Sequence, residues 1–196
     1  MTATQPVLRR EGVARNGHHY LIRPSTDTDA PGLAALIDAV AGEGELLAAV
    51  PGEPDTIEQS LCLVSIVLEG GLSLTLEVDG APAGHVMVQR RAGNHYAHVG
   101  EIAIVVSNAE RGAGLGRMLM ETAIAWGRTV GLAKISLRVF PDNRRALGLY
   151  RSLGFEEEGL VKGEVRMPSG DRDMLLMGLA LDGSGLARAP AILRNE

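Results

Sequence analysis

The sequence has only one cysteine, few aromatic residues and no long apolar run. Because Cys62 stands alone, no disulfide can form within the chain, and a reducing cytoplasm is the compartment that this composition favours. No apolar run approaches the roughly 18 residues of a membrane span, and the first residues lack the apolar core of a secretory signal. We therefore expect a soluble cytoplasmic protein with no membrane partner.

Positive charge is also scarce. The chain has 19 Lys and Arg residues against 24 Asp and Glu residues, for a net charge of −5. A nucleic-acid-binding face needs clustered basic residues, so we expect no nucleic-acid partner. His95 and His98 are spaced as metal ligands can be, but no carboxylate or cysteine set completes a site, and we expect no metal.

What the chain does contain is enough apolar sequence for one folded domain. It has 196 residues, of which 45% are hydrophobic, and it has no internal repeats. A chain of this size forms a single globular unit more readily than two. Residues 1–18 lack sustained periodicity and are predicted to be a flexible N-terminal arm. Residues 19–181 are predicted to form the domain, and residues 182–196 a tail.

Hydrophobic periodicity predicts a mixed α/β (α+β) domain with a mostly antiparallel sheet. Apolar residues spaced as on one helical face predict helices, and alternation predicts strands. Helices are expected over residues 29–41, 57–68, 114–130 and 142–154, and strands over 19–23, 72–78, 83–91, 101–106, 134–140 and in a last hairpin within 156–181. The second helix carries one apolar stripe, formed by Ile57, Leu61, Val64 and Leu68.

The segment "ERGAGLGRM", residues 110–118, has three glycines at alternate positions between a predicted strand and a predicted helix. The first N–H groups of a helix are unpaired and lie at its positive end, so they bind phosphate. Gly112, Gly114 and Gly116 lack the Cβ atoms that would hold a pyrophosphate away, and Arg111 can add a positive charge. The pattern predicts a phosphate-binding loop. The alternative is a turn in which the glycines only permit tight packing.

Two common nucleotide-binding motifs do not fit this segment. A Walker loop ends in Gly-Lys-Ser/Thr, whereas Gly116 is followed by Arg117 and Met118. The dinucleotide pattern G-x-G-x-x-G, counted from Gly112, places Arg117 where the last glycine belongs.

The segment instead has the pattern R-x-x-G-x-G, and a second motif follows it. In "VFPDNRRALGLYRSLGFEEEG", residues 139–159, Asn143 comes after a strand, Tyr150 lies seven residues on, and Leu-Gly-Phe ends the helix. Together the two motifs resemble those of the GNAT superfamily of N-acetyltransferases, and the order of elements over residues 19–181 is similar. The resemblance implies a GNAT-like sheet of six to seven strands flanked by about four helices, with acetyl-CoA (coenzyme A) as cofactor.

The resemblance also implies which residues hold that cofactor. The strand before the loop lines the pantetheine arm, the loop holds the diphosphate, and the helix of the second motif lies beside them. The residues so assigned are Ile104, Val105, Val106, Arg111, Gly112, Ala113, Gly114, Leu115, Gly116, Arg117, Asn143 and Tyr150. Asn143 is in any case placed to cap a helix, and Tyr150 lies on the same helical face two turns later.

Acetyl transfer needs a neutral amine and a proton for the departing thiolate. An alkyl ammonium costs about 4 kcal/mol to deprotonate at pH 7, so a base is useful. The resemblance assigns the acid to Tyr150, whose phenol stays protonated at neutral pH. Glu101 is the candidate base, with His98 or water as the alternatives. Some members carry a base on the strand before the Asn, but Arg138 stands there in this chain.

The acceptor side is less defined. Glu43 and Glu45, in the linker after the first helix, are candidates to pair with a cationic amine, and the last hairpin adds Glu164, Asp171 and Asp173. We expect an acetyl-CoA-dependent N-acetyltransferase acting on the primary amine of a small molecule, amino acid or polyamine-like. The alternatives are a non-catalytic acyl-CoA-binding domain, or an acetyltransferase of protein N-termini or lysines. Members of the superfamily are often dimers, which favours a homodimer.

Overall fold

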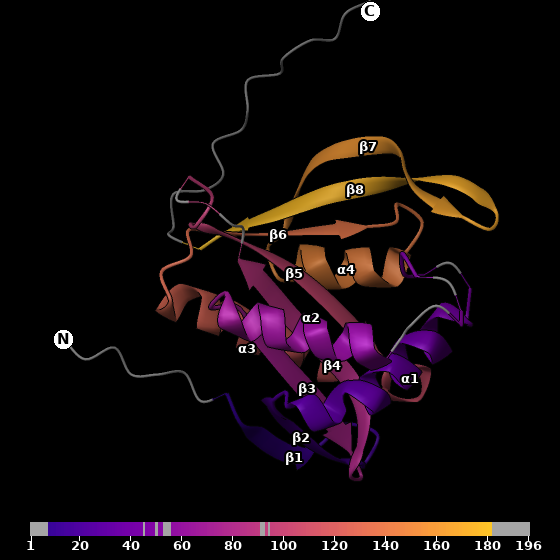
Figure 1. Cartoon of the computed structure of the whole chain (residues 1–196), viewed down its shortest axis with the longest axis vertical. Helices are drawn as coiled ribbons and strands as arrows, with labels where there is room; N and C mark the ends of the chain where they lie inside the picture. Colours follow the sequence, from indigo (N-terminus) through magenta and orange to yellow (C-terminus); the bar gives the residue numbers. More distant parts are fainter. Residues whose placement is uncertain are drawn as a thin grey trace, which may run out of the picture.

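The computed structural model describes residues 8–44, 46–49, 51–52, 56–90, 93 and 95–181, and in this part it contains eight strands and four α-helices (Figure 1). The strands are β1 (Arg10–Val13), β2 (His19–Pro24), β3 (Leu72–Val78), β4 (Ala81–Arg90), β5 (Val99–Val106), β6 (Lys134–Val139), β7 (Glu156–Met167) and β8 (Gly170–Ala180). The helices are α1 (Ala30–Ala41), α2 (Thr56–Leu68), α3 (Leu115–Thr129) and α4 (Arg144–Ser152).

All eight strands form one sheet in the order β1-β2-β3-β4-β5-β6-β8-β7. Every neighbouring pair is antiparallel except β5 and β6, which are parallel. The predicted fold class is therefore confirmed, with eight strands where six to seven were expected. The predicted tail, residues 182–196, lies outside the described residues, and the domain limits remain a prediction.

The additional strand is β1, and it corrects the expectation that residues 1–18 form a flexible arm. Residues 10–13 pair with β2, from Arg10 opposite Ile22 to Val13 opposite His19. The side chains of β1 do not alternate between apolar and polar, so periodicity could not reveal the strand. Its order comes from main-chain hydrogen bonds to a neighbour, which any non-proline sequence can make.

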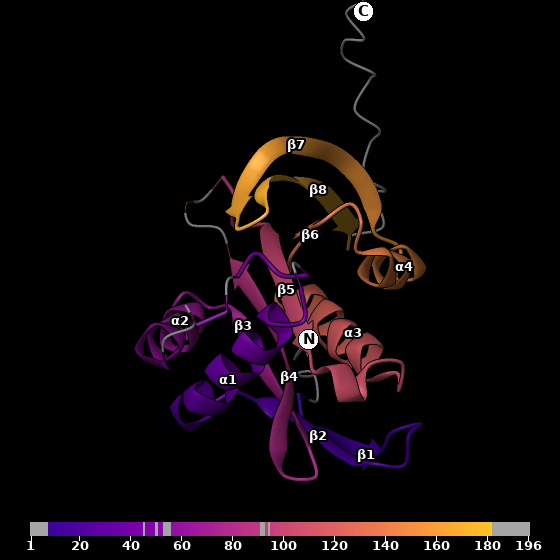
Figure 2. The same ribbon diagram turned by 90° about the vertical axis from the view of Figure 1, so that its right-hand side faces the viewer.

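Helices cover both faces of the sheet (Figure 2). Helices α1 and α2 lie on one face, and α3 and α4 lie on the other. Strand β5 is covered on both sides, because Ile102 is buried in the core beneath α3 while Val105 is buried against α1. This confirms the prediction that the apolar segment after residue 100 is a central strand.

Helix α2 rests on the sheet through a narrow face. Leu63 and Ile66 are buried, and Leu63 packs with residues of α1. The apolar stripe that the sequence shows on this helix points the other way, into solvent.

A charged network is buried where α1 begins. Arg23 donates two hydrogen bonds of 2.7 Å to the carboxylate of Asp29, and it also pairs with Glu77. Burial alone would raise the pKa of Asp29, but hydrogen bonds from Arg23 and from the N–H of Thr26 outweigh it and lower the pKa to about 2. The carboxylate therefore stays ionised at any physiological pH and holds the first turn of the helix to the sheet.

His85 lies in the same layer and makes stability depend on pH. Its Nε2 is 2.8 Å from Oγ of Ser73, and burial lowers its pKa from 6.5 to about 4. The unfolded chain binds a proton to this ring below about pH 6.5, but the folded chain does so only below about pH 4. Stability is therefore lost as the pH falls through this window, by about 3 kcal/mol in all.

We expect His85→Gln to remove most of that pH dependence. Urea unfolding at pH 7 and at pH 4 measures it, with His98→Gln as the control because His98 is exposed. An unchanged difference between the two pH values in His85→Gln would contradict the assignment.

Candidate active site

Strands β5 and β6 separate in the middle of the sheet. They pair through only three residues of β5, the last of which is Glu101. Beyond it β5 continues along β4 to Val106, while β6 continues along β8. On the β6 side, the outward main-chain groups of β5 beyond Glu101 have no strand partner in the described part of the chain, although the carbonyl of Val106 accepts a hydrogen bond from Arg111. They can pair with the amide groups of an elongated ligand, much as a neighbouring strand would.

The two sides of this split differ in chemistry. Alternate residues of a strand point to opposite faces, and Ile104 and Val106 pack into the core beneath α3, as Tyr150 of α4 does. Val105 packs against α1, so Glu101 projects on the α1 side as well. The split therefore has the candidate carboxylate on one face and the candidate phenol on the other.

The glycine loop follows β5 directly and leads into α3. Gly112 has φ +82° and Gly114 has φ +91°, so both adopt the left-handed conformation that favours glycine. Gly114 is the N-cap of α3 and has no side chain to satisfy the helix end. Met118 donates to the carbonyl of Gly114, but within the described residues no carbonyl or side chain accepts from the N–H groups of residues 112–117. These unpaired donors sit at the positive end of a 15-residue helix.

Protein packing does not explain all three glycines. A Cβ on Gly112 would meet nothing within 4 Å, and one on Gly116 would make only ordinary contacts of 3.7 and 3.8 Å. Gly112 is exposed, and Gly116 has no positive φ. The alternative that the glycines serve tight packing therefore fails at these positions. The absence of side chains at these positions leaves the main chain of the loop accessible, as phosphate binding by N–H groups requires.

Arg111 is held by protein groups. Its Nε donates to the carbonyl of Val106 at 3.0 Å, and its guanidinium pairs with Glu43 after α1. The sequence placed Arg111 on the phosphate and Glu43 on the amine, whereas the structure pairs them with each other. Arg117 likewise donates to Ser152 at 2.5 Å.

Arg15 is a cation that sequence analysis missed. It follows β1, and its N–H lies 3.5 Å from the carbonyl of Ala113 in the glycine loop. A Cβ placed on Gly114 would be 3.7 Å from Nε of Arg15. The residue is exposed, and within the described residues its guanidinium has no ion pair. No local pattern marks it, because its place beside the loop depends on the pairing of β1 with β2.

Glu110 anchors the turn that carries Arg15. Its buried carboxylate lies 2.8 Å from Nδ2 of Asn16 and 2.9 Å from Nδ1 of His18. The turn that carries Arg15 is therefore fastened to the start of the glycine loop, and Leu115, the first residue of α3, is fully buried behind it.

Helix α4 is capped at both ends by residues of the second motif. Oδ1 of Asn143 accepts from the N–H of Ala146 at 3.1 Å, which confirms the predicted cap. At the other end Gly154 has φ +92°, and its N–H donates to the carbonyl of Arg151. The N–H of Phe155 donates to the carbonyl of Tyr150, which completes a Schellman motif. The Leu-Gly-Phe sequence is thus a helix stop.

The same helix stop positions Tyr150. The rings of Tyr150 and Phe155 have centroids 5.9 Å apart, and the tyrosine side chain is buried in the main core. Burial raises its pKa to about 12. Its hydroxyl makes no hydrogen bond to the described residues. The hydroxyl oxygen is nevertheless not fully buried. The phenol is therefore neutral and, among the described residues, without a hydrogen-bond partner, while its oxygen keeps some exposure.

The candidate bases differ in position. Glu101 lies at the last residue before the split, 3.7 Å from the guanidinium of Arg138, which is also 3.7 Å from Glu164 of β7. His98 precedes β5, so it lies at the opposite end of the strand from the glycine loop and is exposed. The structure therefore places Glu101 at the split and His98 away from it.

The remaining acceptor candidates are engaged or not described. Glu45 lies outside the described residues. Asp171 pairs with Arg166 and Asp173 with Lys162, which lowers the pKa of each carboxylate. Glu164 of the last hairpin instead lies against Arg138 of β6.

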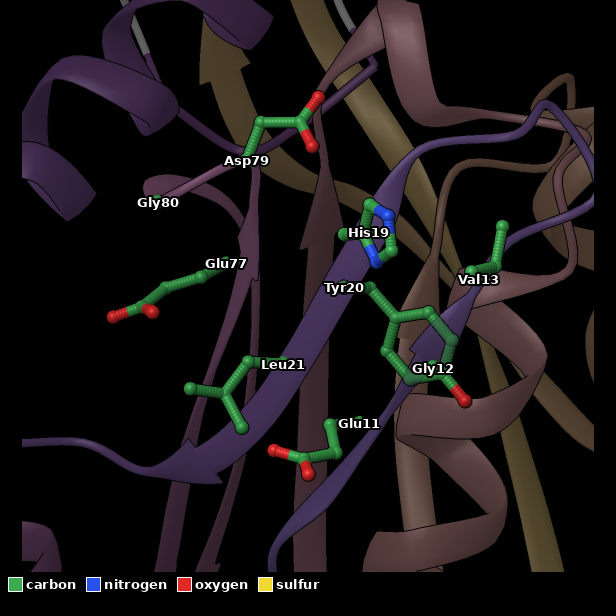
Figure 3. Close-up of a pocket in the computed structure, with 9 residues that line it drawn as sticks. All are labelled: Glu11, Gly12, Val13, His19, Tyr20, Leu21, Glu77, Asp79 and Gly80. Atoms are coloured by element: carbon green, nitrogen blue, oxygen red, sulfur yellow. The ribbon is translucent and has the colours of Figure 1, made fainter.

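A surface hollow of about 580 Å³ lies elsewhere, on β1, β2 and the turn between β3 and β4 (Figure 3). It contains none of the predicted site residues. Within the described residues, no three histidine, cysteine or acidic side chains are grouped as metal ligands. No described helix is long and apolar enough to cross a membrane.

The separation of β5 from β6 and the glycine loop that follows β5 are the two features on which the site is built, and comparison with known proteins shows the family. Residues 45–155, more than half of the chain, match the acetyltransferase (GNAT) family. The chain belongs to this family, so the predicted resemblance is confirmed.

Similar proteins extend this finding. Spermidine N(1)-acetyltransferase of Escherichia coli is 36% identical over 85 residues, covering 43% of this chain and 45% of that protein. The chain spans about half the length of the curated relatives that it matches. A GNAT-family acetyltransferase from Streptococcus pneumoniae is 26% identical, with a TM-score of 0.75 over 82% of this chain and 99% of that one.

Acetyl-CoA, the acetyl donor of this family, is bound in solved structures of the same fold. The yncA protein of Salmonella typhimurium, solved with acetyl-CoA, has a TM-score of 0.75 at 21% identity, over 88% of this chain and 98% of that one.

Proposed function

We propose that the protein transfers an acetyl group from acetyl-CoA to the primary amine of a small molecule. The observation that carries this proposal is the run of unpaired N–H groups at residues 112–117, directly beyond the split between β5 and β6. These groups and the α3 terminus would hold the diphosphate, and the free main chain of β5 would hold the pantetheine arm. When bound, acetyl-CoA supplies an activated thioester.

Two residues of this chain would carry out the proton transfers, one as a base and one as an acid. Glu101, on the α1 side, accepts a proton from the incoming ammonium, directly or through water, which generates the neutral amine. The amine nitrogen would form the C–N bond as the C–S bond breaks; Tyr150, on the α3 side, would give its hydroxyl hydrogen to the departing sulfur and regain a proton from that nitrogen. Because burial keeps the phenol neutral, it acts as a hydrogen-bond donor across the working pH range.

The acceptor is proposed to be cationic and small. Glu101 and Glu164 flank one guanidinium, that of Arg138, and Glu43 borders the α1 side. An ammonium group can compete for these carboxylates. The likeness to a spermidine acetyltransferase supports an amine or polyamine, and the cytoplasmic location expected from composition remains a prediction.

A panel of polyamines, amino acids and peptides with free N-termini, assayed with acetyl-CoA for release of free thiol, tests this function. Turnover with small amines and none with peptides is the expected result. Turnover only with peptides favours a protein acetyltransferase. Tight binding of coenzyme A without turnover on any amine favours a non-catalytic binding domain.

We further expect Arg15→Ala to weaken coenzyme A binding roughly tenfold, as the loss of one charge-assisted contact at an exposed site does. Isothermal titration calorimetry with coenzyme A measures the effect. Arg10→Ala, which removes the same charge from β1, is the control and should bind as the unmodified protein does. Equal affinity of the two variants would remove Arg15 from the site.

A further inference from the structure

Helix α2 presents a continuous apolar stripe to solvent. Its exposed residues lie on one side of the helix, with exposed fractions between 47% and 81%: Ile57, Leu61, Val64, Val67 and Leu68. The opposite side, with Leu63 and Ile66, is buried. Single exposed apolar residues are ordinary, but a contiguous stripe of large aliphatic side chains marks a contact surface.

The spacing of the stripe is the same from either end. Ile57, Leu61, Val64 and Leu68 are separated by four, three and four residues, as in the contact face of a packed helix pair. If a second copy of α2 runs antiparallel across the first, Ile57 meets Leu68 and Leu61 meets Val64, and the same contacts recur on both sides of the two-fold axis. Such self-complementarity is what a symmetric dimer interface requires.

Charge favours a second copy over a membrane surface. Helix α2 contains no lysine or arginine, and its only charged residue is Glu58. Helices that lie on membranes carry basic residues on the polar face to meet anionic lipids. Here the acidic flank would be repelled, whereas the stripe itself is free of charge.

The apolar area of the stripe accounts for most of what a small dimer interface needs. At roughly 100 Å² of apolar surface for each large aliphatic side chain, the stripe exposes on the order of 400 Å² per copy. Two copies, with the polar residues at the border, approach the roughly 1,000 Å² that a specific interface needs.

We propose that the protein is a homodimer in which two α2 helices pack antiparallel through this stripe. This goes beyond the proposed function, because neither the glycine loop nor Tyr150 takes part in it. It assigns a surface to the homodimer that the family resemblance made us expect, and it leaves the split between β5 and β6 open.

Sedimentation of the full chain tests the proposal. The protein should sediment as a dimer of two 20.7 kDa chains. Leu61→Glu places two carboxylates near the two-fold axis and should weaken dimerisation by about a hundredfold or more. Leu61 is 64% exposed, so the fold should be unaffected, as its circular dichroism melt and coenzyme A binding can verify. Val13→Glu is the matched control, because Val13 is 59% exposed but lies on the β1 edge.

A charge-complementation experiment tests the register. Leu61→Glu and Val64→Lys should each be monomeric alone, but a mixture should form heterodimers, because the introduced glutamate meets the introduced lysine while the other Leu61–Val64 contact is kept. A monomeric unmodified protein overturns the proposal. So does a dimer that survives Leu61→Glu, or one that only Val13→Glu dissociates.

Discussion

Gly114→Glu is expected to abolish coenzyme A binding, with a loss of at least about a thousandfold in affinity. The residue has φ +91°, which a side chain disfavours by roughly 1–2 kcal/mol. The introduced carboxylate would also occupy the space before the free N–H groups and repel a diphosphate. The strain is the same with and without ligand, so the loss of affinity comes from the obstruction and the charge repulsion, which we expect to cost at least the roughly 4 kcal/mol that corresponds to a thousandfold. Isothermal titration calorimetry with coenzyme A measures the loss.

Two further glycine variants distinguish the effect of backbone strain from the effect of blocking the space for the diphosphate. Gly80→Glu has the same strain, at φ +83°, in the turn between β3 and β4, with nothing within 4 Å of its Cβ. It should bind coenzyme A normally. Gly116→Ala should fold with unchanged stability, because its Cβ makes only ordinary contacts, yet bind more weakly. Retained tight binding in Gly114→Glu would show that the loop does not hold the diphosphate.

Tyr150→Phe is expected to lower kcat by about a hundredfold while leaving coenzyme A affinity nearly unchanged. The hydroxyl is a donor only during transfer, and loss of a general acid typically reduces the rate by this factor or more. Because the hydroxyl makes no hydrogen bond within the described residues, its removal should not reduce stability. Steady-state kinetics and calorimetry measure the two quantities, with Tyr20→Phe on β2 as the control.

The pH profile adds an independent check on Tyr150. Its pKa is raised to about 12, so the phenol keeps its proton where an ordinary tyrosine, with a pKa near 10, begins to lose it. The rate of the unmodified enzyme should therefore show no loss attributable to tyrosine ionisation up to about pH 10. An unchanged kcat in Tyr150→Phe would exclude the residue from catalysis.

The features that sequence alone predicts at this site are local ones. The glycine loop, the Asn143 cap and the Leu-Gly-Phe stop each depend on backbone geometry within a few residues, and neighbouring side chains in the sequence reveal it. The central strand was equally accessible, because burial on both faces leaves an unbroken apolar run. Strand β1 could not be predicted from the sequence, because pairing through main-chain hydrogen bonds leaves no periodic pattern of side chains.

The sequence by itself determined the family, the glycine loop before α3 and the helix that carries Tyr150, since each follows from the conformations that consecutive residues can adopt. Only the tertiary structure decided that Arg15 lies beside Gly114, that Arg111 pairs with Glu43, and that the stripe on α2 faces solvent. These relationships join residues far apart in the chain or depend on which side of a helix the sheet covers. Spacing along the sequence carries no information on either.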